Sequence, residues 1–517
     1  MPRVPRGISS FILLALSLLE MPPAAGQTVQ PRAEMDHAVV LAGLRQPVYV
    51  LVEFDVAKVE AQAVQERPQM NIGLVLDRSG SMDASGKMEY AKKAARIVVD
   101  RLTPADRLAV VEYDNQVTVL WPSSPVEAPE MIKRRIDGLT PRGGTDLTGG
   151  MMKGVEQVLE NLDRDGINRV LLLSDGMANH GITHPERIAR LVREARQRGV
   201  AISTMGLGLQ YNEDLMQAIA ENAGGHYYYI ENPVQMARIF QQEMEALFTT
   251  VAKEVKIVFV GSQAVEQVEV FGFRSEASGP ETRIPMEDFY AGEKRSLLLR
   301  LEVNPLQEGK IELGKLEFSY LDPLDGRFQR MVLELVVTAS ADSQQVDASR
   351  NERVIAGAAL IEADKRHEEY VRLYEQGRKA EAQGKITTLA DELTDRNVLL
   401  KDVQLAKKIE ALRMEEEEMT EAELDQASRA DYLKKSKLRA YHAQKGQRGK
   451  YLLQEGDEGY DVERLQEALL ARQLYQGPVD GRFGTALVEA VKAFQRQDSL
   501  TVDGVAGPRT MKALQLY

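Results

Sequence analysis

The stretch Ile72-Gly73-Leu74-Val75-Leu76-Asp77-Arg78-Ser79-Gly80-Ser81 decides the fold of the largest part of this chain. Its first half is a short, continuous apolar run, which is typical of a strand buried on both faces of a parallel sheet. A carboxylate and two hydroxyls follow at the point where that strand ends. The stretch therefore predicts both a central strand and a polar site at its carboxyl end.

Residues 70–250 repeat this alternation of apolar strands and amphipathic helices. The expected strands are Ile72–Leu76, Leu108–Tyr113, Val170–Leu173, Ala201–Met205 and Tyr227–Ile230, with helices such as Tyr90–Leu102 and Ile188–Gln197 between them. Alternation of this kind predicts a doubly wound, Rossmann-like α/β domain, in which helices cover both faces of a mostly parallel sheet.

Three polar motifs fall where such a sheet places its ligand site, beyond the carboxyl ends of the strands. They are Asp77-Arg78-Ser79-Gly80-Ser81, Gly143-Gly144-Thr145-Asp146 just before a helix, and Ser174-Asp175-Gly176 after a later strand. The candidate metal ligands are Asp77, Ser79, Ser81, Thr145 and Asp175. Because this set supplies only oxygen, it suits a hard divalent cation, Mg²⁺ first, with Mn²⁺ or Ca²⁺ as alternatives.

These motifs resemble the von Willebrand factor A domain and its metal-ion-dependent adhesion site over about residues 70–250, in the family's order. The resemblance implies that Ser79, Ser81 and Thr145 bind the metal directly and that Asp77 and Asp175 act largely through water. It also implies that an acidic side chain of a partner protein completes the metal's coordination. A domain of this kind with a silent metal site is the alternative.

Known enzyme motifs fit the same residues less well than the adhesion site does. A phosphatase with an aspartyl nucleophile needs a second Asp at position 79, where this chain has Ser. The stretch 80–88 imitates a phosphate-binding loop but has one residue too many and ends in Met88. His180 and His184 flank Gly181 and precede a proline, so a loop is expected there, not a zinc site.

The segment 452–517 reads as a separate small domain of three helices. Two Asp-Gly-x-x-Gly turns, at 480–484 and 503–507, follow the helical patterns Val462–Leu470 and Ala486–Arg496. The segment resembles the peptidoglycan-binding domain often appended to cell-wall hydrolases, which makes peptidoglycan an expected partner. The glycines of both turns are expected to take positive backbone angles, and the residues that contact the glycan stay undetermined. The expected core consists of Leu465, Leu469, Val491 and Phe494.

Two further regions lie between these domains. Residues 255–338 contain short alternating strands and predict a β-sandwich-like module, which the β segment 35–69 could complete. Residues 345–445 are helical and predict one helical hairpin, broken near Gly377 and Gly384. The charged runs Glu415–Glu418 and Lys434–Lys450 are expected to be solvated faces. The whole layout resembles bacterial A-domain proteins often labelled calcium-activated chloride channel homologues, without implying channel activity.

The composition and net charge argue against several classes of function. The chain has 517 residues, a formal net charge of −13, no cysteine and six histidines. A net negative charge argues against general nucleic-acid binding, and the absence of cysteine excludes disulfides and thiolate metal sites. Residues 1–26 read as a secretory signal peptide, and no later window is long and apolar enough for a membrane span. Export to the periplasm or cell wall is expected.

These observations predict an exported, non-enzymatic adhesion or scaffold protein. It would bind an acidic group of an unidentified partner protein through a divalent metal and attach to peptidoglycan through its C-terminal domain. The alternative is a cell-wall hydrolase or a regulator of one. A scaffold that binds through its helical hairpin, residues 352–395, is a third possibility.

Overall fold

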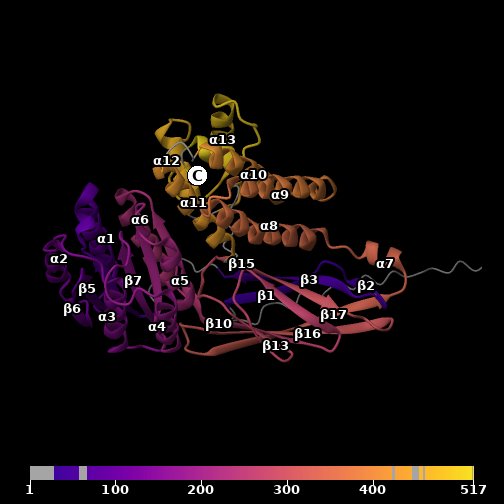
Figure 1. Ribbon diagram of the computed structural model, residues 1–517, viewed down its shortest axis with the longest axis horizontal. Coiled ribbons are helices and arrows are strands. Elements are labelled where there is room, and N and C mark those ends of the chain that lie inside the picture. Colours follow the sequence, from indigo (N-terminus) through magenta and orange to yellow (C-terminus); the bar gives the residue numbers. More distant parts are fainter. Residues whose placement is uncertain are drawn as a thin grey trace, which may run out of the picture.

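The computed structural model describes residues 28–57, 67–421, 426–444, 453–457, 460–514 and 516, so the predicted signal peptide, residues 1–26, lies outside the described residues. An α/β domain lies at the left of Figure 1, and a β sandwich extends to its right. Long helices lie above the sandwich, and a small helical domain sits at the top. The predicted multidomain fold class is confirmed.

The α/β domain is built on a six-stranded sheet in the order β6-β5-β4-β7-β8-β9, parallel except for β6. Its strands are β4 (Met70–Asp77), β5 (Arg107–Tyr113), β6 (Val117–Pro125), β7 (Ile167–Ser174), β8 (Ala201–Leu207) and β9 (Tyr227–Ile230). Its helices are α1 (Lys87–Arg101), α2 (Pro129–Asp137), α3 (Leu147–Leu159), α4 (Pro185–Gln197), α5 (Glu213–Ala223) and α6 (Met236–Phe248), with short 3₁₀ turns η2 (Gly80–Gly86) and η3 (Pro233–Gln235). All five expected strands and both expected helices are present.

Strand β4 is buried along its whole length because helices cover both faces of the sheet. Leu74 packs into a core with α1, α2 and α6, whereas its neighbour Val75 packs into a second core with α3, α4 and α5. Gly73 lets α3 approach closely, since a Cβ there would lie 2.9 Å from Val158 and 3.0 Å from the carbonyl of Gly154. This close contact fixes the helix that follows the Thr145 loop.

Residues 28–57 and 250–340 together form the β sandwich. One sheet has the order β1-β3-β15-β11, and the other has the order β12-β13-β10-β16-β17-β2, with β14 paired to β10. The strands are β1 (Val29–Met35), β2 (Val39–Leu41), β3 (Gln46–Val56), β10 (Thr250–Gly261), β11 (Val265–Phe271), β12 (Glu276–Ser278), β13 (Glu281–Pro285), β14 (Phe289–Tyr290), β15 (Lys294–Val303), β16 (Gly309–Leu321) and β17 (Phe328–Ser340). Both sheets share one core.

The pairing of β3 with β15 answers the question that the sequence left open. The two strands run antiparallel from Gln46 opposite Val303 to Asp55 opposite Lys294. The N-terminal strands therefore complete the sandwich, and the α/β domain is inserted between β3 and β10. Because both ends of the insertion join one sandwich, the α/β domain is connected to the sandwich at its start and at its end.

Residues 343–444 form more than the single hairpin that was expected. The helices are α7 (Ser343–Ala348), α8 (Glu352–Glu375), α9 (Lys379–Leu400), α10 (Val403–Glu421) and α11 (Gln426–Gln444). Gly377, with φ +79°, lies in the α8–α9 turn as predicted, but α9 runs through Gly384 without a break. Helix α8 also covers the outer face of one sandwich sheet, where Val354 and Ala358 pack on Leu51 and Leu298.

The expectation that the two charged runs are solvated is wrong for several of their members. Glu415, Lys434 and Lys437 are buried. The Lys434 ammonium donates to the carbonyl of Tyr211 at 3.1 Å and to the Glu213 carboxylate at 2.6 Å, so α11 is fastened to α5. Buried charges are tolerated when they are paired in this way.

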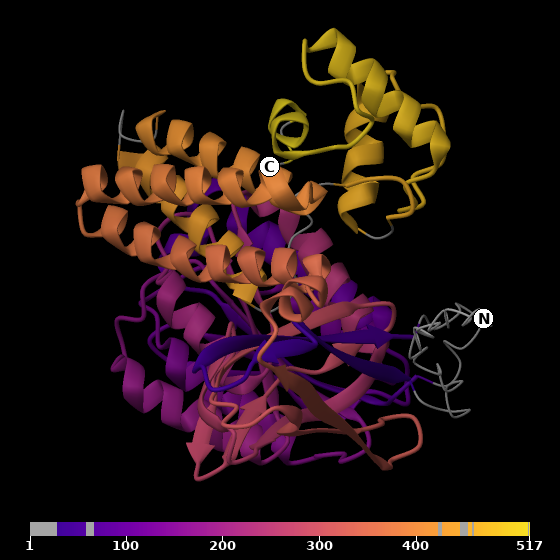
Figure 2. The same cartoon turned by 90° about the vertical axis from the view of Figure 1, so that its right-hand side faces the viewer.

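The C-terminal domain consists of α12 (Tyr460–Ala471), α13 (Thr485–Gln497) and α14 (Pro508–Ala513). The four expected core residues, Leu465, Leu469, Val491 and Phe494, are buried together. Figure 2 shows this domain beside the long helices, and α14 contacts α10. Within the described ranges, no helix combines the length and apolar character needed to cross a membrane.

Candidate metal centre

The five predicted ligands lie at one edge of the α/β sheet. Asp77 is the last residue of β4, and Asp175 directly follows β7, which pairs with β4 in parallel. Carboxyl ends of neighbouring parallel strands meet at the same edge, so both carboxylates face one site. Ser79 and Ser81 lie just after β4, and Thr145 precedes α3.

Asp77 is fully buried and held by donors on both oxygens. The Ser79 amide donates to its Oδ1 at 2.8 Å, and the Ser174 hydroxyl donates to its Oδ2 at 2.8 Å. Burial and the nearby charge of Asp175 raise the pKa of Asp77 to about 6, although these hydrogen bonds lower it. A cation bound nearby would offset both effects.

The hydroxyls of Ser79 and Ser81 are linked to the Asp175 carboxylate, and the Thr145 hydroxyl lies close to Gly176, the next residue. The Oγ atoms of Ser79 and Ser81 lie 3.0 Å apart, and the Ser81 hydroxyl donates to Asp175 Oδ1 at 2.6 Å. A Cβ on Gly176 would lie 3.3 Å from Thr145 Oγ1 and 3.5 Å from Ser81 Oγ, so these two oxygens flank one small space. A side chain at Gly176 would partly fill that space.

Backbone hydrogen bonds hold the loops in register. The Gly80 amide donates to the carbonyl of Gly143 at 3.1 Å, which joins the β4 loop to the Thr145 loop. The Thr145 amide donates to Asn179 Oδ1 at 2.9 Å, which joins it to the loop after β7. The site is therefore preorganised from three loops.

Lys87 also belongs to this site, although it was not predicted as a site residue from the sequence. Its ammonium lies 2.6 Å from Asp175 Oδ2 and 3.4 Å from the carbonyl of Ser81. Lys87 is the first residue of α1, and in the sequence it was noticed as part of the rejected phosphate-loop pattern. A cationic group thus already occupies one side of the Asp175 carboxylate.

The residues present fit a divalent cation. Two carboxylates and three hydroxyls converge, and oxygen donors of this kind are the ligands that Mg²⁺ and Ca²⁺ prefer. The site contains only two carboxylates and depends on hydroxyls for its other ligands. Among the described residues, no group of three or more His, Cys, Asp and Glu side chains is placed to hold a metal. His180 and His184 lie in the exposed loop before α4, as expected.

The two Asp-Gly-x-x-Gly turns of the C-terminal domain are built alike. Gln466 of α12 accepts from the amides of Asp480 and Gly481, and its Nε2 donates to Asp480 Oδ1. Gln495 of α13 makes the equivalent bonds to Asp503 and Gly504, which reveals a structural repeat. These motif residues are scaffold, because their polar atoms are used inside the domain.

The two glycines of each turn differ in backbone conformation. Gly481 and Gly504 have φ of +68° and +77°, as expected, and a side chain at either position would be strained. The second glycine of each turn is instead extended, Gly484 with φ −95° and Gly507 with φ −80°, and forms the N-cap of the following helix. The expectation of positive angles was therefore wrong for the second glycines.

Comparison with known proteins identifies both domains. Residues 71–242 match the family of the von Willebrand factor type A domain. Residues 458–514 match the family described as "Putative peptidoglycan binding domain". The chain therefore contains a von Willebrand factor type A domain followed by a C-terminal peptidoglycan-binding domain. Both are domains of the binding kind.

The matches to two curated relatives are longer than the A domain. The chain is 28% identical over 288 residues to uncharacterized protein sll0103 of Synechocystis sp., covering 54% of this chain and 68% of the relative. It is 30% identical over 246 residues to uncharacterized protein YfbK of Escherichia coli, covering 46% of this chain but only 43% of the relative. The chain thus spans less than half of the second relative.

A solved structure shows the same fold over most of the chain. The von Willebrand factor type A protein from Catenulispora acidiphila matches with a TM-score of 0.58 and 18% identity, covering 74% of this chain and 90% of that one. At this identity the match establishes the fold alone. Its coverage takes in more than the A domain.

Proposed function

We propose that this chain is an exported, wall-tethered binding protein whose A domain captures an acidic partner through a divalent cation. The observation that carries the proposal is the convergence of Asp77, Ser79, Ser81, Thr145 and Asp175 at one sheet edge. Mg²⁺ is the first candidate, with Mn²⁺ and Ca²⁺ as alternatives. The hydroxyls would bind the cation directly, and the two carboxylates would act largely through water.

The charge of the site favours an acidic partner. Two carboxylates balance a divalent cation without exceeding its charge, and Lys87 adds a further positive charge at the same edge. When bound, the cation would supply an open coordination position for a carboxylate oxygen. The protein's own residues fix that position, because three loops hold the ligands before any partner arrives.

The C-terminal domain would supply the tether. It is carried on α10 by ion pairs, including Arg509 with Glu417 at 3.5 Å and Lys407 with Asp503 at 3.4 Å. Tethering to peptidoglycan raises the local concentration of the A domain near other wall components, so a weak metal-bridged contact suffices for capture. Export rests on the sequence of residues 1–26.

Two measurements on the mature chain, residues 27–517, test this proposal. Calorimetric titration should detect saturable binding of Mg²⁺, which Asp77→Ala abolishes and Asp83→Ala preserves, since Asp83 is an exposed acid of the same loop. Sedimentation with purified sacculi should recover all three proteins equally. Failure of the unaltered chain to bind any of the three cations would contradict the metal proposal, and its failure to sediment would contradict the tether.

The absence of catalysis is also a proposal and needs its own test. The hydrolase alternative requires the mature chain to release soluble muropeptides from sacculi. We expect no release above that of a buffer control, with a known muramidase as the positive control. Release that depends on the protein concentration would replace the binding proposal with the hydrolase alternative.

A further inference from the structure

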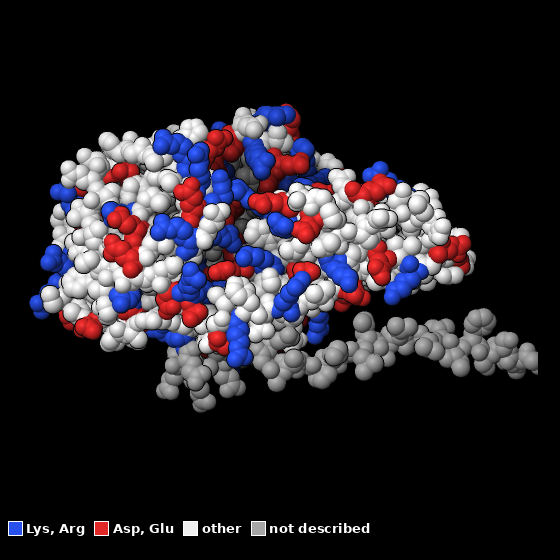
Figure 3. Space-filling model, turned by 90° about the horizontal axis from the view of Figure 1, so that it is seen from below, with Lys and Arg blue, Asp and Glu red and all other residues white. Residues whose placement is uncertain are grey.

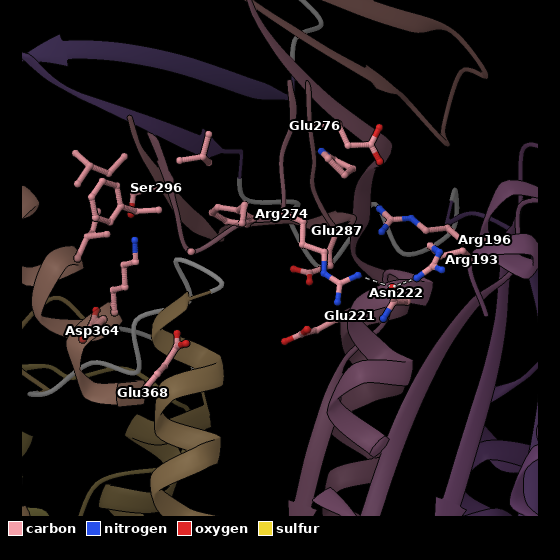
Figure 4. Close-up of a pocket in the computed structure, with 18 of the residues that line it drawn as sticks. Arg193, Arg196, Glu221, Asn222, Arg274, Glu276, Glu287, Ser296, Asp364 and Glu368 are labelled. Atoms are coloured by element: carbon pink, nitrogen blue, oxygen red, sulfur yellow. Dashed lines mark hydrogen bonds between the residues drawn. The ribbon is translucent and has the colours of Figure 1, made fainter. Parts of the chain in front are cut away.

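A pocket of about 490 Å³ lies where the A domain, the sandwich and the long helix α8 meet. Its walls come from the end of α4, the end of α5, the segment after β11, and α8, so three parts of the chain enclose it (Figure 4). A volume of this size is typical of sites for small ligands. The pocket is separate from the metal centre, which shares no lining residue with it.

Three arginines line one side of the pocket without carboxylate partners. Arg193 and Arg274 both donate to Asn222 Oδ1, at 3.1 and 2.7 Å, and Arg196 donates to the carbonyl of Met286 at 2.7 Å. Within the described part of the chain, no ion pair joins any of the three to an acidic side chain. Two guanidinium groups are thus drawn to one neutral oxygen, with most of their donors left for an anion.

Asn222 is built to hold this arrangement. It is buried, and its Nδ2 donates to the carbonyl of Ala218 at 2.6 Å, which fixes the orientation of its amide oxygen toward the arginines. The guanidiniums come from different parts of the chain, Arg193 from α4 and Arg274 from the segment between β11 and β12. The arginine cluster therefore forms only when the A domain is docked on the sandwich.

Two carboxylates reach the pocket from opposite sides, one from α5, which also carries Asn222, and one from α8. Figure 4 shows the carboxylates of Glu221, on α5, and Glu368, on α8, pointing toward one another across the opening. Burial, together with the nearby charges of Glu221 and Asp364, raises the pKa of Glu368 to about 6, although the charges of Arg372 and Lys365 lower it. A ligand cation between these carboxylates would relieve their repulsion. Phe271, Leu298 and Ile361 also line the pocket and add apolar surface.

Figure 3 shows that charged side chains of both signs gather in the middle of the molecule, between the A-domain and sandwich lobes. We propose that the pocket binds a short zwitterionic peptide, whose carboxylate is held by Arg193, Arg196 and Arg274 and whose ammonium is held by Glu221 and Glu368. Such a peptide could be free or part of a wall stem peptide, since both carry the same two groups. The proposal does not depend on the metal centre.

The test is calorimetric titration of the mature chain with the tripeptide lysyl-alanyl-alanine as the probe. Its C-terminal amide lacks the carboxylate, and its fully acetylated form lacks the ammonium groups. We expect saturable binding of the tripeptide and binding at least about tenfold weaker for each blocked form, because a charge-assisted contact is lost. A wall stem tetrapeptide titrated in parallel distinguishes the sources: tighter binding points to the wall, and equal binding points to free peptides.

Substitutions of lining residues test whether the peptide binds in this pocket. The double variant Arg193→Gln, Arg274→Gln should lose at least about tenfold in affinity, and Glu368→Gln should lose discrimination against the acetylated form. Arg198→Gln, a matched exposed arginine at the end of α4 outside this pocket, should bind normally. Equal affinity in the double variant and Arg198→Gln would overturn the proposal. So would the absence of binding of both peptides at millimolar concentration.

Discussion

The ammonium of Lys87 lies 2.6 Å from Asp175 Oδ2, and the Ser81 hydroxyl donates to the other oxygen of the same carboxylate at 2.6 Å. Asp175 is fully buried, so this pairing neutralises a charge that would otherwise be costly. A divalent cation at the site would approach a carboxylate that already has a cationic partner. Lys87 is therefore expected to oppose the binding of the cation.

Replacing Lys87 should strengthen cation binding. Lys87→Gln removes one positive charge from the edge of the site, and the gain at such short range is on the order of 1–2 kcal/mol, about tenfold in affinity. Lys93→Gln makes the same change of charge at an exposed position of α1 and should leave affinity unaltered. Calorimetric titration with Mg²⁺ measures both. Weaker binding by Lys87→Gln would show instead that Lys87 positions Asp175 for the metal.

Cation binding should strengthen as the pH rises through about 6. The pKa of Asp77 is raised to about 6 in the metal-free protein, so the native state holds a proton there that the unfolded chain has already lost. Stability from this group is present at low pH and is lost as the pH rises through 6, while the ionised form favours the cation. The increase in Tm caused by Mg²⁺ should therefore be small at pH 5 and larger at pH 7.5.

Asp77→Asn provides the control for this pH dependence. Without the titrating group, the Mg²⁺-induced change in Tm should be small and should not grow with pH. A shift for the unaltered chain that is the same at pH 5 and pH 7.5 would contradict the assignment of the pH dependence to Asp77.

Glu415 should be a major determinant of the stability of the long helices. It accepts from Ser436 at 2.5 Å, pairs with His367 at 3.0 Å and lies 3.3 Å from the hydroxyls of Tyr370 and Tyr432. Breaking a buried pair of this kind costs about 3–5 kcal/mol, so Glu415→Ala should lower the free energy of unfolding in urea by that order. Glu417→Ala, which removes an exposed carboxylate of the same helix, should cost less than about 1 kcal/mol.

The effect of Glu415 should depend on pH in a defined direction. Burial alone would raise its pKa, but His367, Arg439 and its hydrogen bonds hold the pKa well below the usual range. A lowered carboxyl pKa contributes stability above the unfolded value, and that contribution is lost as the pH falls. The difference in unfolding free energy between the unaltered chain and Glu415→Ala should therefore shrink from pH 7 to pH 3. An undiminished difference at pH 3 would contradict this account.

Gln495 should hold the second turn of the wall-binding domain. Gln495→Ala leaves the amides of Asp503 and Gly504 without their acceptor, at a cost of about 1–3 kcal/mol. We expect a lower Tm for the C-terminal domain and weaker sedimentation with sacculi. Gln497→Ala, two residues along the same helix and exposed, should leave both unchanged. Equal Tm values for the two variants would contradict the structural role.

Local sequence patterns were sufficient to predict elements whose burial is visible in their own residues. The run before Asp77 predicted a strand buried on both faces because its residues alternate between two helical layers. Strand β16 was not predicted, since Gly314, with φ of +143°, interrupts its alternating pattern at a shift of register. Strand β6 was also missed: it is an antiparallel edge strand with irregular register that contains Pro122, which edge strands tolerate.

Contacts between distant segments could not be inferred from composition. Glu415 stands in an acidic run that reads as a solvated face, and its burial depends on His367 and Ser436 from other helices. Lys87 meets Asp175 across the sheet edge, so its place in the site needs the folded α/β domain. The five predicted ligands needed no such information, because strand ends and a helix start in a parallel sheet bring them to one edge.

The most direct test of the central claim is capture of an envelope protein on immobilised residues 27–517 in Mg²⁺, followed by elution with a chelator. The account predicts a protein that the chelator releases from the unaltered and Asp83→Ala columns and that is absent from the Asp77→Ala and Thr145→Ala columns. Thr145→Ala removes only a hydroxyl and one methyl group, so it separates loss of the ligand from a large change of the fold. An eluate that is empty, or identical from all four columns, would contradict metal-dependent capture.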